Sequence, residues 1–255
     1  MAGTDRTREP VLGGPAIVLV APQLGENIGA AARAMYNFGL TDLRLVAPRD
    51  GWPNAKARAS ASGADVVIDG ARVFDTTAQA IADLRHVYAA TARPRDARKA
   101  VMTPAHAARS MRAVSPEGAG CGVLFGGERA GLDNDDMALA EVIVSVPVNP
   151  AFSSLNLAQA VLLMGYEWFH AGDATPDVQT DDGPTGPATK ADLIGLFEHL
   201  ESELERGGFL YPPEKAPTIA RNIRTMLQRA RLTEQEVRTF RGIIKALTEL
   251  RQRGT

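Results

Sequence analysis

Polar side chains suited to binding an anion or an oxyanion follow two apolar runs in the middle of the chain. Residues 122–125 are followed by Gly126-Gly127-Glu128-Arg129-Ala130-Gly131-Leu132, and residues 142–146 by Asn149-Pro150 and then Ser153-Ser154-Leu155-Asn156. Glycine permits φ > 0 and lets a ligand approach the backbone closely. We expect a serine to cap the helix at residues 155–169, whose free N–H groups favour a carboxylate or an oxyanion. Either bend alone also fits an ordinary turn, but the two in this order favour a ligand site.

Two further groups follow apolar runs nearer the N-terminus. Residues 16–21 are followed by Asn27-x-Gly29-x-x-x-Arg33 in a predicted helix, where Arg33 lies off the apolar stripe. Arg33 is either a solvated helix charge or part of a site. Residues 86–90 are followed by a basic loop that carries four cations, Arg93, Arg95, Arg98 and Lys99, against Asp96. Such a loop suits phosphate groups, although a solvated loop is the alternative.

All four groups follow predicted β-strands, which alternate with predicted helices. Strands are expected at residues 16–21, 43–46, 66–68, 86–90, 122–125 and 142–146, and helices at residues 25–39, 54–62, 76–84, 103–114 and 155–169. This alternation is typical of an α/β fold in which a parallel sheet has helices on both faces. Ligands of such sheets bind beyond the carboxyl ends of the strands, so we expect the four groups to converge.

The composition excludes several classes of function. The 255 residues carry a formal net charge of −2 and a pI near 6.1, so local patches would have to bind any nucleic acid. Cys121 is the one cysteine and the four histidines lack the spacing of metal ligands, so we expect no disulfide and no metal. No apolar run approaches the roughly 20 residues of a membrane span, and the N-terminus has no signal-peptide core, so we expect a cytoplasmic protein without membrane contact.

The four groups together resemble motifs of the SPOUT superfamily of S-adenosylmethionine-dependent RNA methyltransferases, in its TrmH (SpoU) branch. The resemblance is carried by Asn27 and Arg33, by Gly126, Glu128, Gly131 and Leu132, and by Ser154, Leu155 and Asn156. It implies methyl transfer from S-adenosylmethionine to a ribose 2′-hydroxyl, a homodimer, and a C-terminal trefoil knot in the catalytic domain. Periodicity could not have shown a knot, because knotted chains are rare.

The resemblance also implies roles for individual residues. The catalytic residues would be Asn27, Arg33, Ser154 and Asn156. Arg33 would stabilise the oxyanion or orient the group that takes the proton, because a guanidinium stays protonated. The cofactor would be bound by Ala90, Thr91, Ala92, Gly126, Glu128, Val146, Ser153, Ser154 and Leu155, and RNA would be contacted by Arg93 and Arg95. Glu128 could order its loop, pair with a basic side chain or approach the ammonium group of the cofactor, and the sequence does not choose among these.

The end of the chain differs in composition from the rest. Residues 1–14 are expected to be a flexible tail, residues 15–170 the methyltransferase domain, and residues 171–188 an acidic flexible linker. Residues 189–255 are expected to form an all-α extension with helices at 191–206, 218–229 and 234–251, the last with a capping box at Thr233 and Glu236.

A basic segment in this extension is the predicted contact with tRNA. Residues 215–231 contain five cations and no acid. We expect Arg221, Arg224, Gln228 and Arg231 to share one stripe of a helix that faces the phosphate backbone, although such a stripe is often only a solubilising face.

The whole chain most resembles TrmJ-type tRNA methyltransferases, which carry a comparable extension. The resemblance implies methylation of the pyrimidine at position 32 of the anticodon loop. The alternatives are methylation of rRNA or of another tRNA position, a non-catalytic RNA-binding module of the same fold, and a nucleotide-binding dehydrogenase. The dehydrogenase is disfavoured because residues 22–29, after the first strand, lack a Gly-x-Gly-x-x-Gly pattern. The polar residues present in all three motifs disfavour the non-catalytic module.

Overall fold

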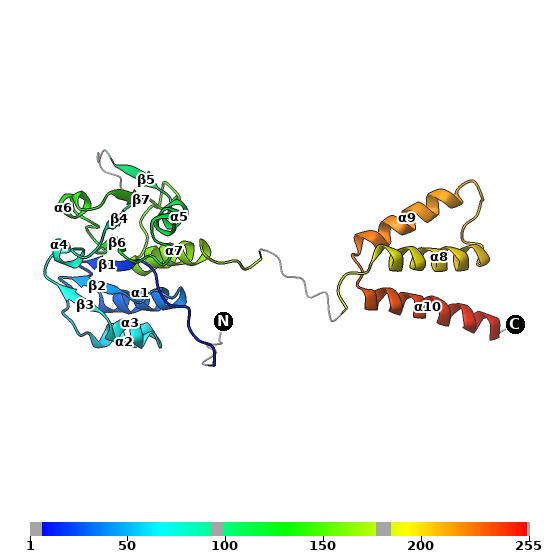
Figure 1. Cartoon of the computed structure of the whole chain (residues 1–255), viewed down its shortest axis with the longest axis horizontal. Coiled ribbons are helices and arrows are strands. Elements are labelled where there is room, and N and C mark those ends of the chain that lie inside the picture. Colours follow the sequence, from blue (N-terminus) through cyan, green and yellow to red (C-terminus); the bar gives the residue numbers. More distant parts are fainter. Residues whose placement is uncertain (1–6, 93–98, 177–184, 254–255) are drawn as a thin grey trace. The chain divides into compact units, whose positions relative to one another are not determined.

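Within the described residues, seven strands form one parallel sheet (Figure 1). The structure, a computed structural model, describes residues 7–92, 99–176 and 185–253 and divides into two compact units, Met1–Thr175 and Pro176–Thr255. The sheet belongs to the first unit, and its strand order is β3-β2-β1-β6-β4-β7-β5. The strands are β1 (Ala16–Val20), β2 (Leu43–Val46), β3 (Arg72–Phe74), β4 (His86–Ala90), β5 (Ala100–Met102), β6 (Cys121–Gly126) and β7 (Val142–Val144). The predicted α/β fold with a parallel sheet is confirmed.

Helices cover both faces of this sheet (Figure 1). One face packs against α1 (Gly25–Asn37), α2 (Ala55–Ala61), α3 (Asp65–Asp69), α5 (Pro104–Val114) and α7 (Leu157–His170), and the other against α4 (Thr77–Ala80) and α6 (Asn134–Ala138). In β1, Ile17 and Leu19 belong to the first core, and Val18 and Val20 belong to the second. This alternation follows from the period of two of a β-strand.

Gly29 allows α1 to lie close against α2. A Cβ at this position would lie 2.1 Å from the carbonyl oxygen of Ala57, so any larger residue would push the two helices apart. Ile28 and Met35 on the same helix are buried in the core, as the apolar stripe predicts. This packing fixes α1, and with it the position of Asn27 in its first turn.

Some short elements differ from the predictions. The predicted strand at residues 66–68 is wrong, because this segment lies in helix α3, where Val67 and Ile68 are buried and Val66 is 48% exposed. A run of three apolar residues fits either a strand or a helix, and packing against α1 and α2 decides between them. The predictions also lack β3, β5 and α6, which are only three, three and five residues long.

The second unit contains three helices where the structure describes it: α8 (Lys190–Arg206), α9 (Ala216–Arg229) and α10 (Glu234–Arg253). Its core consists of Leu193, Leu196, Phe197, Leu227, Leu232, Val237 and Ile244. A capping box formed by Thr189 and Asp192 begins α8. Reciprocal hydrogen bonds between Thr233 and Glu236 begin α10, as the sequence predicts.

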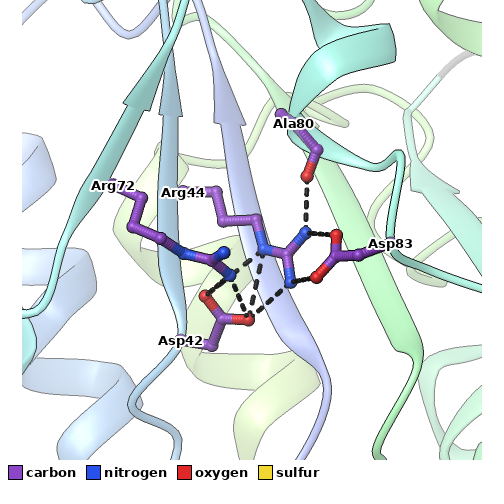
Figure 2. Close-up of polar contacts among 5 residues, drawn as sticks. All are labelled: Asp42, Arg44, Arg72, Ala80 and Asp83. Atoms are coloured by element: carbon purple, nitrogen blue, oxygen red, sulfur yellow. Dashed lines mark hydrogen bonds and ion pairs between the residues drawn. The ribbon is translucent and has the colours of Figure 1, made fainter.

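A buried arginine joins β2 to the segment after α4 (Figure 2). Arg44 is 2% exposed, and its guanidinium donates hydrogen bonds to Asp42, to Asp83 and to the carbonyl oxygen of Ala80. Arg72 of β3 donates to Asp42 at 2.9 Å. We call these five residues the Arg44 network.

The Arg44 network shifts the titration of both carboxyl groups. Hydrogen bonds from Arg44 lower the pKa of Asp83. At Asp42, burial raises the pKa, but hydrogen bonds from Arg44 and Arg72 outweigh burial and the net shift is downward. Both groups are therefore carboxylates at neutral pH, and they compensate the buried charge of Arg44.

Candidate functional site

A cavity of about 250 Å³ lies at the carboxyl ends of β4, β6 and β7. These strands are neighbours in the sheet, where Ala90 pairs with both Phe125 and Val144. The segments that follow the three strands therefore meet, although they are far apart in the sequence. All the residues predicted to bind the cofactor line this cavity: Ala90, Thr91, Ala92, Gly126, Glu128, Val146, Ser153, Ser154 and Leu155.

The loop after β6 closes on itself at the edge of the cavity. Gly127 and Gly131 form an antiparallel bridge, and Gly131 has φ +69°, a conformation that favours glycine. A Cβ at Gly126 would lie 2.0 Å from the backbone carbon of Gly131. Glycine at position 126 is therefore required by the backbone of its own loop, whereas the sequence suggests a close approach by a ligand.

Glu128 extends from this loop to the segment before α1. Its carboxylate accepts hydrogen bonds from Asn27 Nδ2 at 2.7 Å and from the backbone N–H groups of Gln23 at 2.8 Å and Leu24 at 3.3 Å. Burial raises the pKa of the Glu128 carboxyl, but these hydrogen bonds outweigh burial and the pKa lies below its ordinary value. Glu128 is therefore a carboxylate at neutral pH that ties the loop after β6 to the start of α1.

Asn156 completes a chain of hydrogen bonds between the three motifs. Its Nδ2 donates to Asn27 Oδ1 at 3.0 Å, while its Oδ1 accepts from the backbone N–H groups of Ala158 and Gln159. The cap of α7 is thus Asn156, in a capping box with Gln159, and the expectation of a serine cap is wrong. We call Glu128, Asn27 and Asn156 the Asn27 network.

The two other predicted catalytic residues lie outside this network. Ser154 is exposed and lines the cavity two residues before Asn156. Arg33 is exposed on α1, six residues after Asn27. No hydrogen bond or ion pair joins Arg33 to another side chain in the described part of the chain, so its guanidinium is accessible to solvent.

The predicted RNA-binding arginines do not form one continuous stripe. Arg93 and Arg95 lie outside the described residues. In the second unit, Arg221 is exposed on α9 and donates hydrogen bonds within its own helix. Arg231 is also exposed, but α9 ends at Arg229 and the backbone of Arg231 has φ +50°. Arg231 therefore does not continue the helical stripe, contrary to the prediction.

Arg224 is held within the second unit. Its guanidinium forms a two-bond ion pair with Glu201 of α8, in which both N–O distances are 2.6 Å, and lies 5.9 Å from the centre of the Phe197 ring. The hydrogen bonds with Glu201 raise the pKa of Arg224. The predicted stripe overlooks this partner, because the partner lies on a neighbouring helix.

The residues that the structure describes include neither a metal-binding cluster of side chains nor a helix suited to crossing a membrane. Among them, no group of three or more His, Cys, Asp or Glu side chains is placed to hold a metal. None of the helices in the described ranges is both long and apolar enough to span a membrane. Cys121 is buried in β6, and burial raises the pKa of its thiol, as expected of a small core residue.

Comparison with known proteins extends over both units. Residues 14–166, which contain the sheet, the cavity and the Asn27 network, match the family described as SpoU rRNA Methylase. The tRNA (cytidine/uridine-2′-O-)-methyltransferase TrmJ of Klebsiella pneumoniae is 34% identical over 239 residues, which are 91% of this chain and 96% of that protein. The chain belongs to the SpoU methylase family, in its TrmJ group. Residues 191–255 match the C-terminal domain of tRNA methyltransferase TrmJ.

Solved structures agree with this assignment to the SpoU family. The crystal structure of TrmJ from Z. mobilis ZM4 is 53% identical, covers 91% of this chain and 98% of that chain, and has a TM-score of 0.78. A structure described as structural insights into the 2-OH methylation of C/U34 on tRNA is 26% identical with a TM-score of 0.50. The match covers 96% of that structure's chain but only 62% of this chain, so that protein corresponds to less than two-thirds of this one.

The SpoU site also contains groups that the sequence analysis does not single out. Arg129 is exposed and lines the cavity beside Glu128, without an ion pair or hydrogen bond to any other described side chain. The backbone N–H groups of Gln23 and Leu24 hold Glu128. Their place directly after the first strand is the signal that could have found them, because ligand sites of parallel sheets lie there.

Proposed function

We propose that this protein transfers a methyl group from S-adenosylmethionine to a ribose 2′-hydroxyl of tRNA. The observation that carries the proposal is the Asn27 network, because it joins the three motif segments beside a cavity at the carboxyl ends of the strands. Membership of the SpoU family supports the reaction. The name of the Klebsiella relative, a tRNA (cytidine/uridine-2′-O-)-methyltransferase, supports the substrate.

The lining of the cavity fits S-adenosylmethionine. Ala90, Ala92 and Gly126 line it with small residues, Thr91 and Ser154 add hydroxyl groups, and Val146 and Leu155 provide apolar surface. Such a mixture suits a ligand that has a flat heterocycle and polar edges. When bound, the cofactor supplies a methyl group that is already activated. The protein then has to align the two reacting centres and stabilise the attacking oxygen.

We assign Arg33 to the developing negative charge on the ribose oxygen. A guanidinium stays protonated in proteins, so it is a poor base and a good partner for an oxyanion or a phosphate. Its exposure and its lack of a described partner leave it available to a substrate. We assign Ser154 to a hydrogen bond with the ribose.

We assign Asn27, Asn156 and Glu128 mainly to positioning. Asn27 donates to Glu128 and accepts from Asn156, so both ends of its amide are held in one orientation. Asn156 in addition caps α7. Of the three roles open to Glu128, ordering of its loop is the one that its hydrogen bonds to Asn27, Gln23 and Leu24 support.

We propose position 32 of the anticodon loop as the target, following the resemblance to the TrmJ group. Position 34 is named in the description of one solved structure, and rRNA is named in the description of the family. The match of residues 191–255 to the TrmJ C-terminal domain favours the TrmJ target, because the position-34 structure corresponds to less than two-thirds of this chain.

We propose that residues 189–255 help to hold tRNA, joined by the linker at residues 171–188 to a methyltransferase domain at residues 15–170. Arg221 and Arg231 are better suited than Arg224 to contact phosphate, since Arg224 already has a carboxylate partner. This assignment requires that Arg221→Ala weaken the binding of tRNA and reduce the dependence of affinity on salt concentration. Arg224→Ala should change that salt dependence less.

We propose further that the domain is knotted and forms a homodimer. Placement of β6 between β1 and β4, and of β7 between β4 and β5, supports a knot because the chain twice inserts a strand between two earlier strands. The exposed side chains of Leu162 and Tyr166 on α7, beside the Phe38 ring, offer apolar surface for a second copy.

Substitution of Arg33 tests the catalytic assignment. Arg33→Ala is expected to lower turnover at least 100-fold, the usual cost of removing one oxyanion-stabilising donor, while the affinity for S-adenosylmethionine measured by calorimetry stays within about twofold. Neither Arg33 nor Arg109 lines the cavity, and Arg109→Ala is the matched control because Arg109 is an exposed arginine on α5, a helix that carries none of the predicted site residues. Near-normal turnover of Arg33→Ala would remove Arg33 from the mechanism.

Mapping of ribose methylation in cells that lack the protein tests the substrate. The expected result is loss of one 2′-O-methyl group at tRNA position 32. A loss confined to rRNA or to position 34 would overturn the proposed target. An unchanged methylation map, together with no binding of S-adenosylmethionine by the purified protein, would overturn the enzymatic proposal.

A further inference from the structure

Phe152 is an exposed aromatic residue beside the cavity. Its 78% exposure is the highest among the large hydrophobic residues that the structure describes as exposed. It lies directly before Ser153 and two residues before Ser154, both of which line the cavity. The ring thus contributes almost nothing to the core of the protein, yet it belongs to the segment that lines the cavity.

The backbone of Phe152 is held in a defined turn. Asn149 Oδ1 accepts a hydrogen bond from the N–H of Ala151 at 3.0 Å, and the carbonyl oxygen of Asn149 accepts one from the N–H of Phe152 at 2.9 Å. An ordered turn that presents an apolar ring to solvent limits the conformational entropy that is lost when a ligand covers the ring.

A comparison with Tyr166 shows that the exposure of Phe152 is of a different kind. Tyr166 is 48% exposed, but its ring packs edge-on against Phe38 at 6.0 Å and stacks on His170 at 5.6 Å. No ring contact involves Phe152 among the described aromatic residues. Most of the Phe152 side chain is therefore open to a stacking partner.

We propose that Phe152 stacks on the base of an unpaired nucleotide next to the ribose that is methylated. The proposal rests on the proposed function. Proteins that recognise single-stranded RNA loops stack unstacked bases on aromatic side chains, and a base has a flat face whatever its identity. The segment from Val142 to Tyr166 contains no Asp or Glu, so it does not repel the phosphates on either side of such a base.

A second copy of the chain is the competing partner for the ring. The position of Phe152 favours RNA, because a subunit that covered this ring would also crowd the cavity lined by Ser153 and Ser154. A base stacked on Phe152 would instead keep its ribose and the neighbouring ribose at the cavity.

The test uses the full-length protein and an anticodon stem-loop RNA. Phe152→Leu keeps the apolar character but removes the ring, and Phe152→Trp keeps a ring. Phe152→Leu is expected to weaken RNA binding by about 5- to 100-fold, the range for loss of one stacked base, whereas Phe152→Trp stays near the wild type. S-adenosylmethionine affinity by calorimetry and oligomeric state by sedimentation are expected not to change in either variant.

An abasic nucleotide on either side of the methylated ribose gives the decisive readout. One of the two abasic RNAs is expected to bind weakly to the wild-type protein. Its affinity should match that of unmodified RNA for the Phe152→Leu variant. In Phe152→Leu the same RNA is expected to show little further loss, because the two changes remove the same contact. The proposal would be overturned if the losses from the abasic RNA and from Phe152→Leu multiplied. It would also be overturned if Phe152→Leu bound RNA as tightly as the wild type does, or if a dimer dissociated in that variant. Failure of the wild type to methylate any RNA would instead contradict the proposed function and would leave the role of Phe152 in RNA binding to be judged from the affinities.

Discussion

Two polar networks in the first unit have similar chemistry and different surroundings. In the Arg44 network, the guanidinium is 2% exposed and bonds to two carboxylates and a carbonyl oxygen (Figure 2). In the Asn27 network, a half-buried carboxylate and two amides join the three motif segments beside a cavity. The first network uses its hydrogen-bonding capacity within the protein, and the second leaves part of it for a ligand.

This difference separates stability from function. Removing the partners of a buried charge costs several kcal/mol of folding free energy, so the Arg44 network holds β2, β3 and the segment after α4 together. The Asn27 network orders the residues around a cavity, and its hydrogen bonds fix the direction of the amide of Asn27 rather than compensate a buried charge. Substitutions in the first network should therefore change folding, and those in the second should change turnover.

Arg44→Met tests the first half of this contrast and has the largest expected effect on stability. The free energy of unfolding in urea should fall by about 3 kcal/mol, at the low end for a broken buried ion pair because Asp42 and Asp83 are partly exposed. Turnover of the folded fraction should stay within twofold. Arg72→Ala is the matched control, and its exposed ion pair with Asp42 should account for no more than about 1 kcal/mol.

Glu128→Gln tests the second half of the contrast. Because an NH2 group replaces one oxygen, the side chain can no longer accept hydrogen bonds from all of Asn27, Gln23 and Leu24. Asn27 should therefore lose its fixed orientation. A misplacement of about 1 Å at a reacting centre can cost roughly 100-fold, so kcat/KM for tRNA should fall about 100-fold. The free energy of unfolding should fall less than in Arg44→Met. A larger loss of stability than of turnover would contradict the division between the two networks.

The pH dependence of stability gives the smallest expected effect. Asp42, Asp83 and Glu128 all have folded-state pKa values below the ordinary ones. Their stabilisation is therefore complete above the unfolded pKa values of about 4 and is lost as the pH falls through the lower folded values. Between about pH 5 and pH 3, the urea midpoint of the wild type should fall, and that of Arg44→Met should fall less steeply. Equal slopes would show that Arg44 does not set the titration of Asp42 and Asp83.

Much of the fold was predictable because the inner strands of this parallel sheet are largely apolar runs. β1, β2, β4 and β6 lie where the apolar runs predict them, and the cavity lies where the loops after such strands must meet. The strand predicted at residues 66–68 failed because three apolar residues carry no period, so packing against α1 and α2 imposed a helix.

The sequence by itself determined the alternation of the longer strands and helices, the residue types of the three motifs and their places after strands, because hydrophobic period and glycine or proline breaks are local properties. Only the tertiary structure decided which polar groups found one another. Asn27 meets Glu128 across 101 positions and Asn156 across 129, while Arg224 is paired with Glu201 on another helix. A hydrogen bond depends on direction and on distances of about 3 Å, and both are fixed only when separate elements have packed.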